Sequence, residues 1–271
     1  MFVVFLMPLS NKTKKPRQAK LKNEKLQKVL AREGMGSRRE IEQWIREERV
    51  SVNGVVARLG DRVDAKDRLL VDGELIATET NTTKKSRCII YNKPVGQICT
   101  RKDPKKRRSV FEDLPKLSSG RWISVGRLDY NTSGIMLFTT DGNLANSLMH
   151  PSSQIEREYV VRVRGRVERK NLENMVSGVM FEDGLARFTD IQPGGGDGSN
   201  RWFYVVVMQG RNREVRRLWE SQGLTVSRLK RVRFGPLIIP SKLRRGDWME
   251  VSVPQKEKLY QMTGSQRDKI I

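Results

Sequence analysis

The sequence predicts an α+β fold with a mixed, mainly antiparallel sheet. Its 271 residues are enough for one large domain or two smaller ones. Strand patterns outnumber helix patterns, and short turns typical of hairpins are more frequent than the long crossovers that parallel strands require. A polar, Thr/Lys-rich stretch at residues 78–87 interrupts these patterns and reads as a linker. We therefore expect a small N-terminal domain, a linker and a larger second domain.

The sequence of the first domain, residues 24–77, predicts two helices followed by a small sheet. A first helix over residues 24–33 would bury one apolar face, formed by Leu26, Val29 and Leu30. Ser37 followed by Glu40 is a capping box that begins a second helix, whose buried face is Ile41, Trp44 and Ile45. An Asn-Gly pair at Asn53 then predicts a tight hairpin turn between two short strands.

The sequence of the second domain, residues 88–254, predicts more strands than helices. Strands are expected at residues 88–91, 122–125, 135–139, 155–163, 188–191, 202–208, 226–234, 237–239 and 248–253, and helices at 143–150, 168–177 and 212–221. Alternation in the strand 226–234 predicts two faces, one with Val232 and Phe234 and the other with Arg231 and Arg233. We expect residues 255–271 to form a C-terminal helix or tail, and residues 1–23 to form a disordered basic arm.

The composition indicates a polyanionic partner. The chain carries 53 Lys and Arg against 31 Asp and Glu, a formal charge of +22, and the arginines continue through both domains. Its two cysteines and one histidine do not form a zinc-ligand pattern or a disulfide framework, so we expect no metal, no cofactor and a cytoplasmic location. The apolar residues 1–9 are too few to span a membrane, and no membrane association is expected.

The most particular motif is V-G-R-L-D-Y-N-T-S-G-I at residues 125–135. Apolar runs on both sides place Asp129 in a turn between two strands. A lone aspartate in such a turn would ordinarily be a solvated side chain. However, the pattern G-R-L-D-x-x-[ST]-x-G-[LI] resembles the catalytic motif of the RNA pseudouridine synthases. The resemblance implies that Asp129 is the catalytic carboxylate, and we expect Arg127, Asn131 and Thr132 beside it to bind the substrate.

Three further segments resemble the same family. The run at residues 211–217, R-N-R-E-V-R-R, is similar to the family motif G-R-x-R-[QE]-[IVL]-R. The last arginine of that motif pairs with the catalytic aspartate and corresponds to Arg216. The apolar residue before it contacts the base and corresponds to Val215. Tyr159, in R-E-Y-V-V, corresponds to a tyrosine that stacks on the target base, and Lys93 begins a K-P-x-G segment assigned to substrate binding. From periodicity alone, the arginines could form a solvated helix face and Tyr159 could belong to the core.

The N-terminal domain resembles the S4 RNA-binding domain over residues 25–76. The resemblance implies that Arg32, Arg38 and Arg39 bind structured RNA, although a solvated basic helix face has the same pattern. An S4 domain ahead of G-R-L-D-x-x-[ST] is typical of synthases that modify ribosomal RNA. The chain most resembles the B-type large-subunit branch, which acts on a uridine of 23S rRNA in the peptidyl-transferase region. Tyr130 departs from the Val or Leu expected after the aspartate, which leaves fine specificity open.

We therefore expect a monomer that isomerises a uridine to pseudouridine in large-subunit rRNA or its assembly precursor. Asp129 would either attack the sugar or remove a ribose proton, and both roles require it to be ionised. Two alternatives stay open: a synthase that acts on 16S rRNA, and a non-catalytic assembly factor of the S4 type. A phosphodiesterase would need a metal-binding carboxylate cluster, which the sequence does not show.

Overall fold

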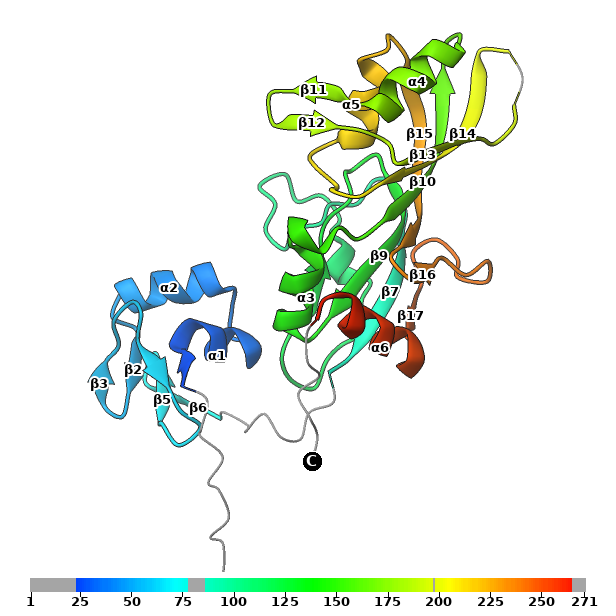
Figure 1. Ribbon diagram of the computed structural model, residues 1–271. Coiled ribbons are helices and arrows are strands. Elements are labelled where there is room, and N and C mark those ends of the chain that lie inside the picture. The colour runs from blue at the N-terminus through cyan, green and yellow to red at the C-terminus, as the bar shows by residue number, and fades with distance from the viewer. Residues whose placement is uncertain (1–22, 78–85, 197, 265–271) are drawn as a thin grey trace, which may run out of the picture. The chain divides into compact units, whose positions relative to one another are not determined.

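The computed structural model describes residues 23–77, 86–196 and 198–264 (Figure 1). The chain divides into two compact units, one of residues 1–31 and 35–80 and the other of residues 32–34 and 81–271. The expected basic arm lies outside the described residues except for Asn23, and the expected linker does so except for Ser86 and Arg87. Within the described ranges, no helix is both long and apolar enough to cross a membrane.

The first unit packs two helices against a four-stranded sheet. The helices are α1 (Leu26–Arg32) and α2 (Arg38–Arg46), and the sheet order is β3 (Val55–Val56), β2 (Val50–Val52), β5 (Leu69–Val71) and β6 (Glu74–Ile76). A separate short pair joins β1 (Glu24–Lys25) to β4 (Arg62–Val63). The capping box is confirmed, because the Glu40 backbone N–H donates to Ser37 Oγ at 3.1 Å and the Ser37 N–H donates to Glu40 Oε2 at 2.8 Å.

The second unit is built on a nine-stranded sheet within the described residues. Its main path runs β13 (Asp190–Pro193), β14 (Asn200–Val207), β10 (Arg157–Arg164), β15 (Thr225–Phe234), β9 (Ser133–Thr139), β7 (Cys88–Lys93) and β17 (Trp248–Glu250), while β16 (Leu237–Ile238) pairs with β15 and β8 (Ile123–Val125) with β9. Only the β15–β9 pair is parallel among these pairings. The predicted mixed, mainly antiparallel sheet is therefore confirmed.

Helices and a hairpin cover the two faces of this sheet (Figure 1). They are η1 (Val110–Glu112), α3 (Gly142–Met149), η2 (Pro151–Ser153), α4 (Arg169–Ser177), β11 (Val179–Phe181) with β12 (Gly184–Ala186), α5 (Glu214–Glu220) and α6 (Val253–Met262). Alternate residues of β9 enter two different cores. Met136 and Phe138 pack with residues of β10, β14 and α5, whereas Ile135 and Leu137 pack with residues of α3 and α6. The final helix therefore completes the second core.

The prediction that Arg231 lies on the opposite face of its strand from Phe234 is wrong. Tyr159 pairs with Arg231 but Glu158 pairs with Arg233, so the β10–β15 register shifts and Val232 is an extra residue. Such a bulge breaks the two-residue alternation. Arg231 consequently lies on the buried side with Phe234, and its side chain is only 2% exposed. The β11–β12 hairpin was also missed, because its three-residue strands carry too short a pattern to predict.

Candidate active site

Asp129 lies in the turn between β8 and β9, as the sequence predicts. The Thr132 N–H donates to the Asp129 carbonyl oxygen at 3.0 Å, and the Gly96 N–H donates to the Tyr130 carbonyl oxygen at 2.8 Å. Gly134 ends the turn with φ of 110° and pairs in parallel with Arg231 of β15. A Cβ at this position would lie 2.1 Å from the Arg231 carbonyl oxygen, so only glycine fits.

Lys93 supports this turn from inside the protein. Its side chain is fully buried, and Nζ donates to the carbonyl oxygens of Pro94 at 3.0 Å, Asp129 at 3.0 Å and Thr132 at 2.8 Å. Burial lowers the pKa of Lys93, and the nearby Cys99 and Asp129 oppose that shift. The substrate contact expected for Lys93 is not available in this arrangement, because the ammonium group already donates twice to the turn and once to the Pro94 carbonyl oxygen.

Arg216 reaches the same turn from α5. Its guanidinium donates from Nη1 to the Val226 carbonyl oxygen at 2.9 Å and from Nη2 to the Asn131 carbonyl oxygen at 3.0 Å. Burial, and then Arg213, lower the pKa of Arg216, whereas Asp129 raises it. In the part of the chain that the structure describes, no ion pair joins Arg216 to Asp129. The expected salt bridge is therefore replaced by a hydrogen bond to the turn that carries the carboxylate.

A cavity of about 420 Å³ opens beside Asp129. Five of the expected site residues line it: Arg127, Asp129, Thr132, Tyr159 and Val215. Tyr159 is 8% exposed and extends from β10 between Val205 of β14 and Arg231 of β15. Asn131, Lys93 and Arg216 do not line the cavity: Asn131 is an exposed residue of the turn itself, and Lys93 and Arg216 donate hydrogen bonds to the turn. The fold thus brings segments that are far apart in the sequence to one cavity.

The cavity also contains charged residues that the sequence analysis missed, namely Arg157, Arg231 and Glu214. Arg231 Nε donates to the Ile135 carbonyl oxygen at 2.8 Å, and Arg157 Nη1 donates to those of Ile155 and Met208, both at 2.8 Å. Each guanidinium lies 5.3 Å from the centre of the Phe234 ring. The two-residue alternation of β10 could have revealed Arg157, which shares the face of Tyr159.

Two polar atoms at this cavity are buried without a hydrogen-bond partner, Thr132 Oγ1 and Arg231 Nη2. Buried polar atoms are normally paired, and an unpaired one raises the free energy of the folded state. Burial also raises the pKa of Glu214, whose Oε2 accepts from the Arg211 N–H at 3.0 Å. The cavity therefore offers hydrogen-bonding capacity that the protein itself does not use.

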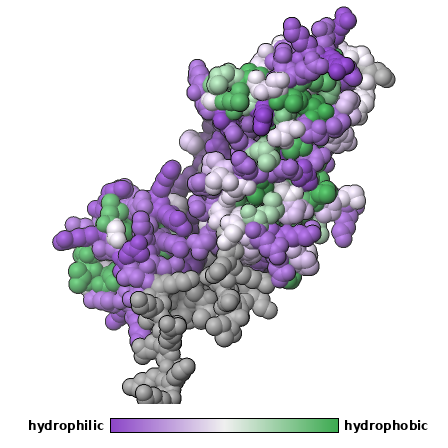
Figure 2. All heavy atoms as spheres, viewed as in Figure 1, coloured by the Kyte–Doolittle hydropathy of each residue, from purple (hydrophilic) through white to green (hydrophobic). Residues whose placement is uncertain are grey.

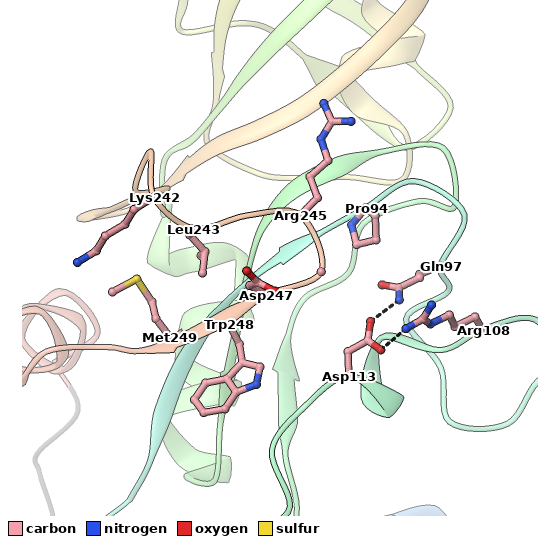
Figure 3. Close-up of a pocket in the computed structure, with 11 residues that line it drawn as sticks. Pro94, Gln97, Arg108, Asp113, Lys242, Leu243, Arg245, Asp247, Trp248 and Met249 are labelled. Carbon is pink, nitrogen blue, oxygen red and sulfur yellow. Dashed lines mark hydrogen bonds and ion pairs between the residues drawn. The ribbon is translucent and has the colours of Figure 1, made fainter.

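A second pocket, of about 880 Å³, lies at the β7–β17 edge of the sheet (Figure 3). Asp113 is fixed there by Arg108 Nη2 at 2.6 Å and Gln97 Nε2 at 2.6 Å. Arg245 and Trp248 also line this pocket. None of the expected site residues does, so the smaller cavity at Asp129 is the candidate active site.

The expected RNA-binding arginines lie on the two helices of the N-terminal region. Arg38 and Arg39 are exposed in the first turn of α2, where free backbone N–H groups also favour anions. Arg32 ends α1, is partly buried, and lies 3.5 Å from Glu33. Hydrophilic residues cover most of the surface visible in Figure 2.

The chain matches known proteins along both units. A family model described as RNA pseudouridylate synthase matches residues 87–221, and one described as S4 domain matches residues 24–69. The protein named Ribosomal large subunit pseudouridine synthase B of Pseudomonas aeruginosa is 58% identical over 242 residues, which cover 89% of this chain and 63% of that relative. The protein of the same name from Vibrio vulnificus is 54% identical over 259 residues, which cover 90% of this chain and 81% of the relative.

A solved structure shares the fold. The structure titled "Crystal structure of pseudouridylate synthase" aligns over 87% of this chain and 99% of its own, with a TM-score of 0.61 and 22% sequence identity. Among the described residues, no group of three or more His, Cys, Asp or Glu side chains could hold a metal ion. From the identity and coverage of its relatives, the chain belongs to the family of RNA pseudouridylate synthases that carry an S4 domain ahead of the synthase domain.

Proposed function

We propose that this protein converts a uridine of large-subunit rRNA to pseudouridine, with Asp129 as the catalytic carboxylate. The observation that carries the proposal is the cavity that joins Asp129 to Tyr159 and Val215, residues of three separate segments. The names of the relatives support the substrate class, since they are synthases of the large ribosomal subunit. The target proposed from the sequence resemblance is a uridine of 23S rRNA in the peptidyl-transferase region.

The target base must leave its stack to reach a cavity of this kind. Extrusion of a base costs a few kcal/mol, and stacking on an aromatic ring recovers about 1–3 kcal/mol. In our proposal the uracil lies against the Tyr159 ring, with Val215 as its apolar neighbour. The unpaired Arg231 Nη2 and Thr132 Oγ1 then gain partners from the polar edge of the base or from the ribose. Exposed Arg127, at the mouth of the cavity, binds the adjoining phosphate.

The chemistry breaks the bond from N1 of the uracil to C1′ of the ribose and forms a bond from C5 to C1′. The proton on C5 is lost and N1 gains one, so the reaction is an isomerisation. Asp129 either attacks the sugar or removes a ribose proton, and it must be ionised for both. Arg216 supports this state by its positive charge, while its hydrogen bond to the Asn131 carbonyl oxygen and those of Lys93 hold the carboxylate in place.

The N-terminal unit positions the enzyme on its substrate. We propose that Arg38 and Arg39, with Arg32, bind backbone phosphates of folded rRNA or of an assembly precursor, because structured RNA is recognised mainly by shape and phosphate contacts. The partner is therefore ribosomal RNA, and the protein acts as a monomer in the cytoplasm.

Asp129→Asn tests the catalytic assignment. Pseudouridines are mapped in rRNA from cells that carry the parent protein, the Asp129→Asn variant or the Asp190→Asn variant. Asp190 is an exposed carboxylate of the same unit and does not line the cavity, which makes it a matched control. We expect one uridine of the large-subunit rRNA to lose its modification in the Asp129→Asn strain only. Loss of a site in 16S rRNA would refute the substrate, and full modification in the Asp129→Asn strain would refute the role of Asp129.

A further inference from the structure

Tyr130 is an exposed aromatic residue directly after Asp129. Its side chain is 50% exposed, and it does not line the cavity that contains Asp129. Its backbone is held in place, because its carbonyl oxygen accepts the Gly96 N–H at 2.8 Å. The ring is therefore carried on a fixed turn, one residue from the catalytic carboxylate but outside the pocket for the target base. A single exposed aromatic residue is common on protein surfaces, so exposure alone assigns no role.

A second observation is the arginine beside the ring. The guanidinium of Arg107 lies 5.8 Å from the centre of the Tyr130 ring, within the range of a cation–π contact. The guanidinium donates from one edge to both carboxylate oxygens of Asp103, from Nε to Oδ2 at 3.0 Å and from Nη2 to Oδ1 at 2.8 Å. The carboxylate thus orders the cation next to the ring.

The segment that carries Arg107 is strongly basic. Residues 101–108 contain six Lys or Arg residues and one acidic residue, and all six basic residues are exposed. Arg108 is anchored by Asp113 at 2.6 Å, and Asp113 also accepts from the buried Tyr91 hydroxyl at 2.7 Å. Arg108 therefore ties the basic loop to the folded unit, whereas Asp103 orders Arg107 from within the loop. Exposed aromatic rings beside ordered cations are the chemistry that binds unpaired nucleotides, with the ring taking the base and the cation the phosphate.

We propose that Tyr130 stacks on the base of a nucleotide adjacent to the target uridine, and that Arg107 binds the phosphate of that nucleotide. The proposal rests on the proposed function for the position of the uridine. A uridine that leaves its stack deprives each neighbouring base of a stacking partner. Tyr159 inside the cavity serves the extruded base, and Tyr130 outside it replaces the lost partner of the neighbour. Tyr130 is thus a substrate-positioning residue that favours RNAs with an unpaired base at this point.

The test is a double-mutant cycle, in which the side chain of Tyr130 and the neighbouring base of the RNA are removed singly and together, and binding is measured. The probe is an RNA fragment that covers the peptidyl-transferase region of 23S rRNA, in intact form and with an abasic nucleotide on either side of the modified uridine. All proteins carry Asp129→Asn so that no turnover occurs. We expect Tyr130→Val to weaken binding of the intact RNA about 5- to 150-fold, and Tyr130→Phe to change it less than about twofold. Tyr204→Val is the matched control, because Tyr204 is 43% exposed on β14 and should have no effect.

An abasic nucleotide at one of the two positions should remove most of the Tyr130→Val effect, because the base that the ring contacts is then missing. The inference is overturned if Tyr130→Val binds the intact RNA as tightly as the parent, or if it loses the same factor on all three RNAs. Pseudouridine formation by the protein without Asp129→Asn, on the same intact RNA, tests the proposed function separately. If pseudouridine forms but Tyr130→Val does not weaken binding, only the stacking is refuted. If Tyr130→Val weakens binding of the intact RNA more than of one abasic RNA but no pseudouridine forms, only the isomerase assignment is refuted.

Discussion

The two units of this protein differ in whether they bury charged side chains. Among the described residues 23–77, the only buried polar side chain is that of Gln27, and the core is apolar, with Leu26, Leu30 and Ile41 fully buried. Among residues 86–196 and 198–264, five charged side chains are buried, all within the sheet or in α5: Lys93, Arg157, Glu214, Arg216 and Arg231. Three of the five line the cavity at Asp129, and the other two hold its turn.

This difference follows from what each charge contacts. A buried charge is costly unless its hydrogen bonds are made within the protein, and these buried cations donate to backbone carbonyls of separate segments. Lys93 and Arg216 thereby join the aspartate turn to Pro94, which follows β7, and to Val226 of β15. Arg38 and Arg39 are exposed instead, and we propose that they bind phosphates. The buried charges of the second unit thus organise the candidate site, and the exposed arginines of the first unit form the surface that we propose binds RNA.

The largest expected effect is at the close contact behind the aspartate turn. Gly134→Ala would place a Cβ 2.1 Å from the Arg231 carbonyl oxygen, at a φ of 110°. We expect it to lower the free energy of unfolding by more than about 4 kcal/mol, measured by urea denaturation. Gly54→Ala in the first unit is the control. Its φ is also positive, but nothing lies within 4 Å, so about 1 kcal/mol is expected. Equal losses at the two glycines would contradict the close packing.

Arg216→Ala should reduce turnover strongly while the protein still binds RNA. We expect the single-turnover rate at saturating rRNA fragment to fall about 10²- to 10³-fold, because the turn loses its hydrogen bond at Asn131 and the carboxylate loses a nearby cation. Arg39→Ala, a change of the same kind on the first unit, should leave this rate unchanged. A loss confined to affinity would show that Arg216 contacts phosphate instead.

Lys93→Met should destabilise the second unit by about 2–3 kcal/mol, since three carbonyl oxygens lose a charged donor. Lys66→Met, at an exposed position of the first unit, should change stability by less than about 0.5 kcal/mol. Thermal unfolding of both variants measures the difference. If the two lysines proved equally tolerant, burial of charge would not be what holds the turn.

The smallest effects are expected from single arginines of the first unit. Arg38→Ala and Arg39→Ala should each weaken rRNA binding a few-fold and reduce the slope of log affinity against log salt by about one. The rate at saturating RNA should not change. Binding titrations at several salt concentrations provide the measurement, and an unchanged slope in the double variant would remove this surface from the RNA interface.

The sequence by itself determined the fold class, the two-part organisation and the family. Local rules were sufficient for the capping box at Ser37 and for the hairpin at Asn53, since both depend on neighbours in the chain. The motif around Asp129 identified the turn and its strands because apolar runs on either side are a local signal.

Only the tertiary structure decided how that turn is held. The bulge at Val232 moved Arg231 to the buried face, and a one-residue insertion of this kind leaves no trace in an alternating pattern. Lys93 and Arg216 proved to bind backbone carbonyls of distant segments, which depends on the pairing of β7, β9 and β15 rather than on spacing. The contact of Arg107 with the Tyr130 ring also became evident only in the tertiary structure. Residue type indicates what a side chain can bind. Contacts such as Lys93 with Asp129 and Arg216 with Asn131, 36 and 85 residues apart in the chain, are set by the packing of the whole sheet.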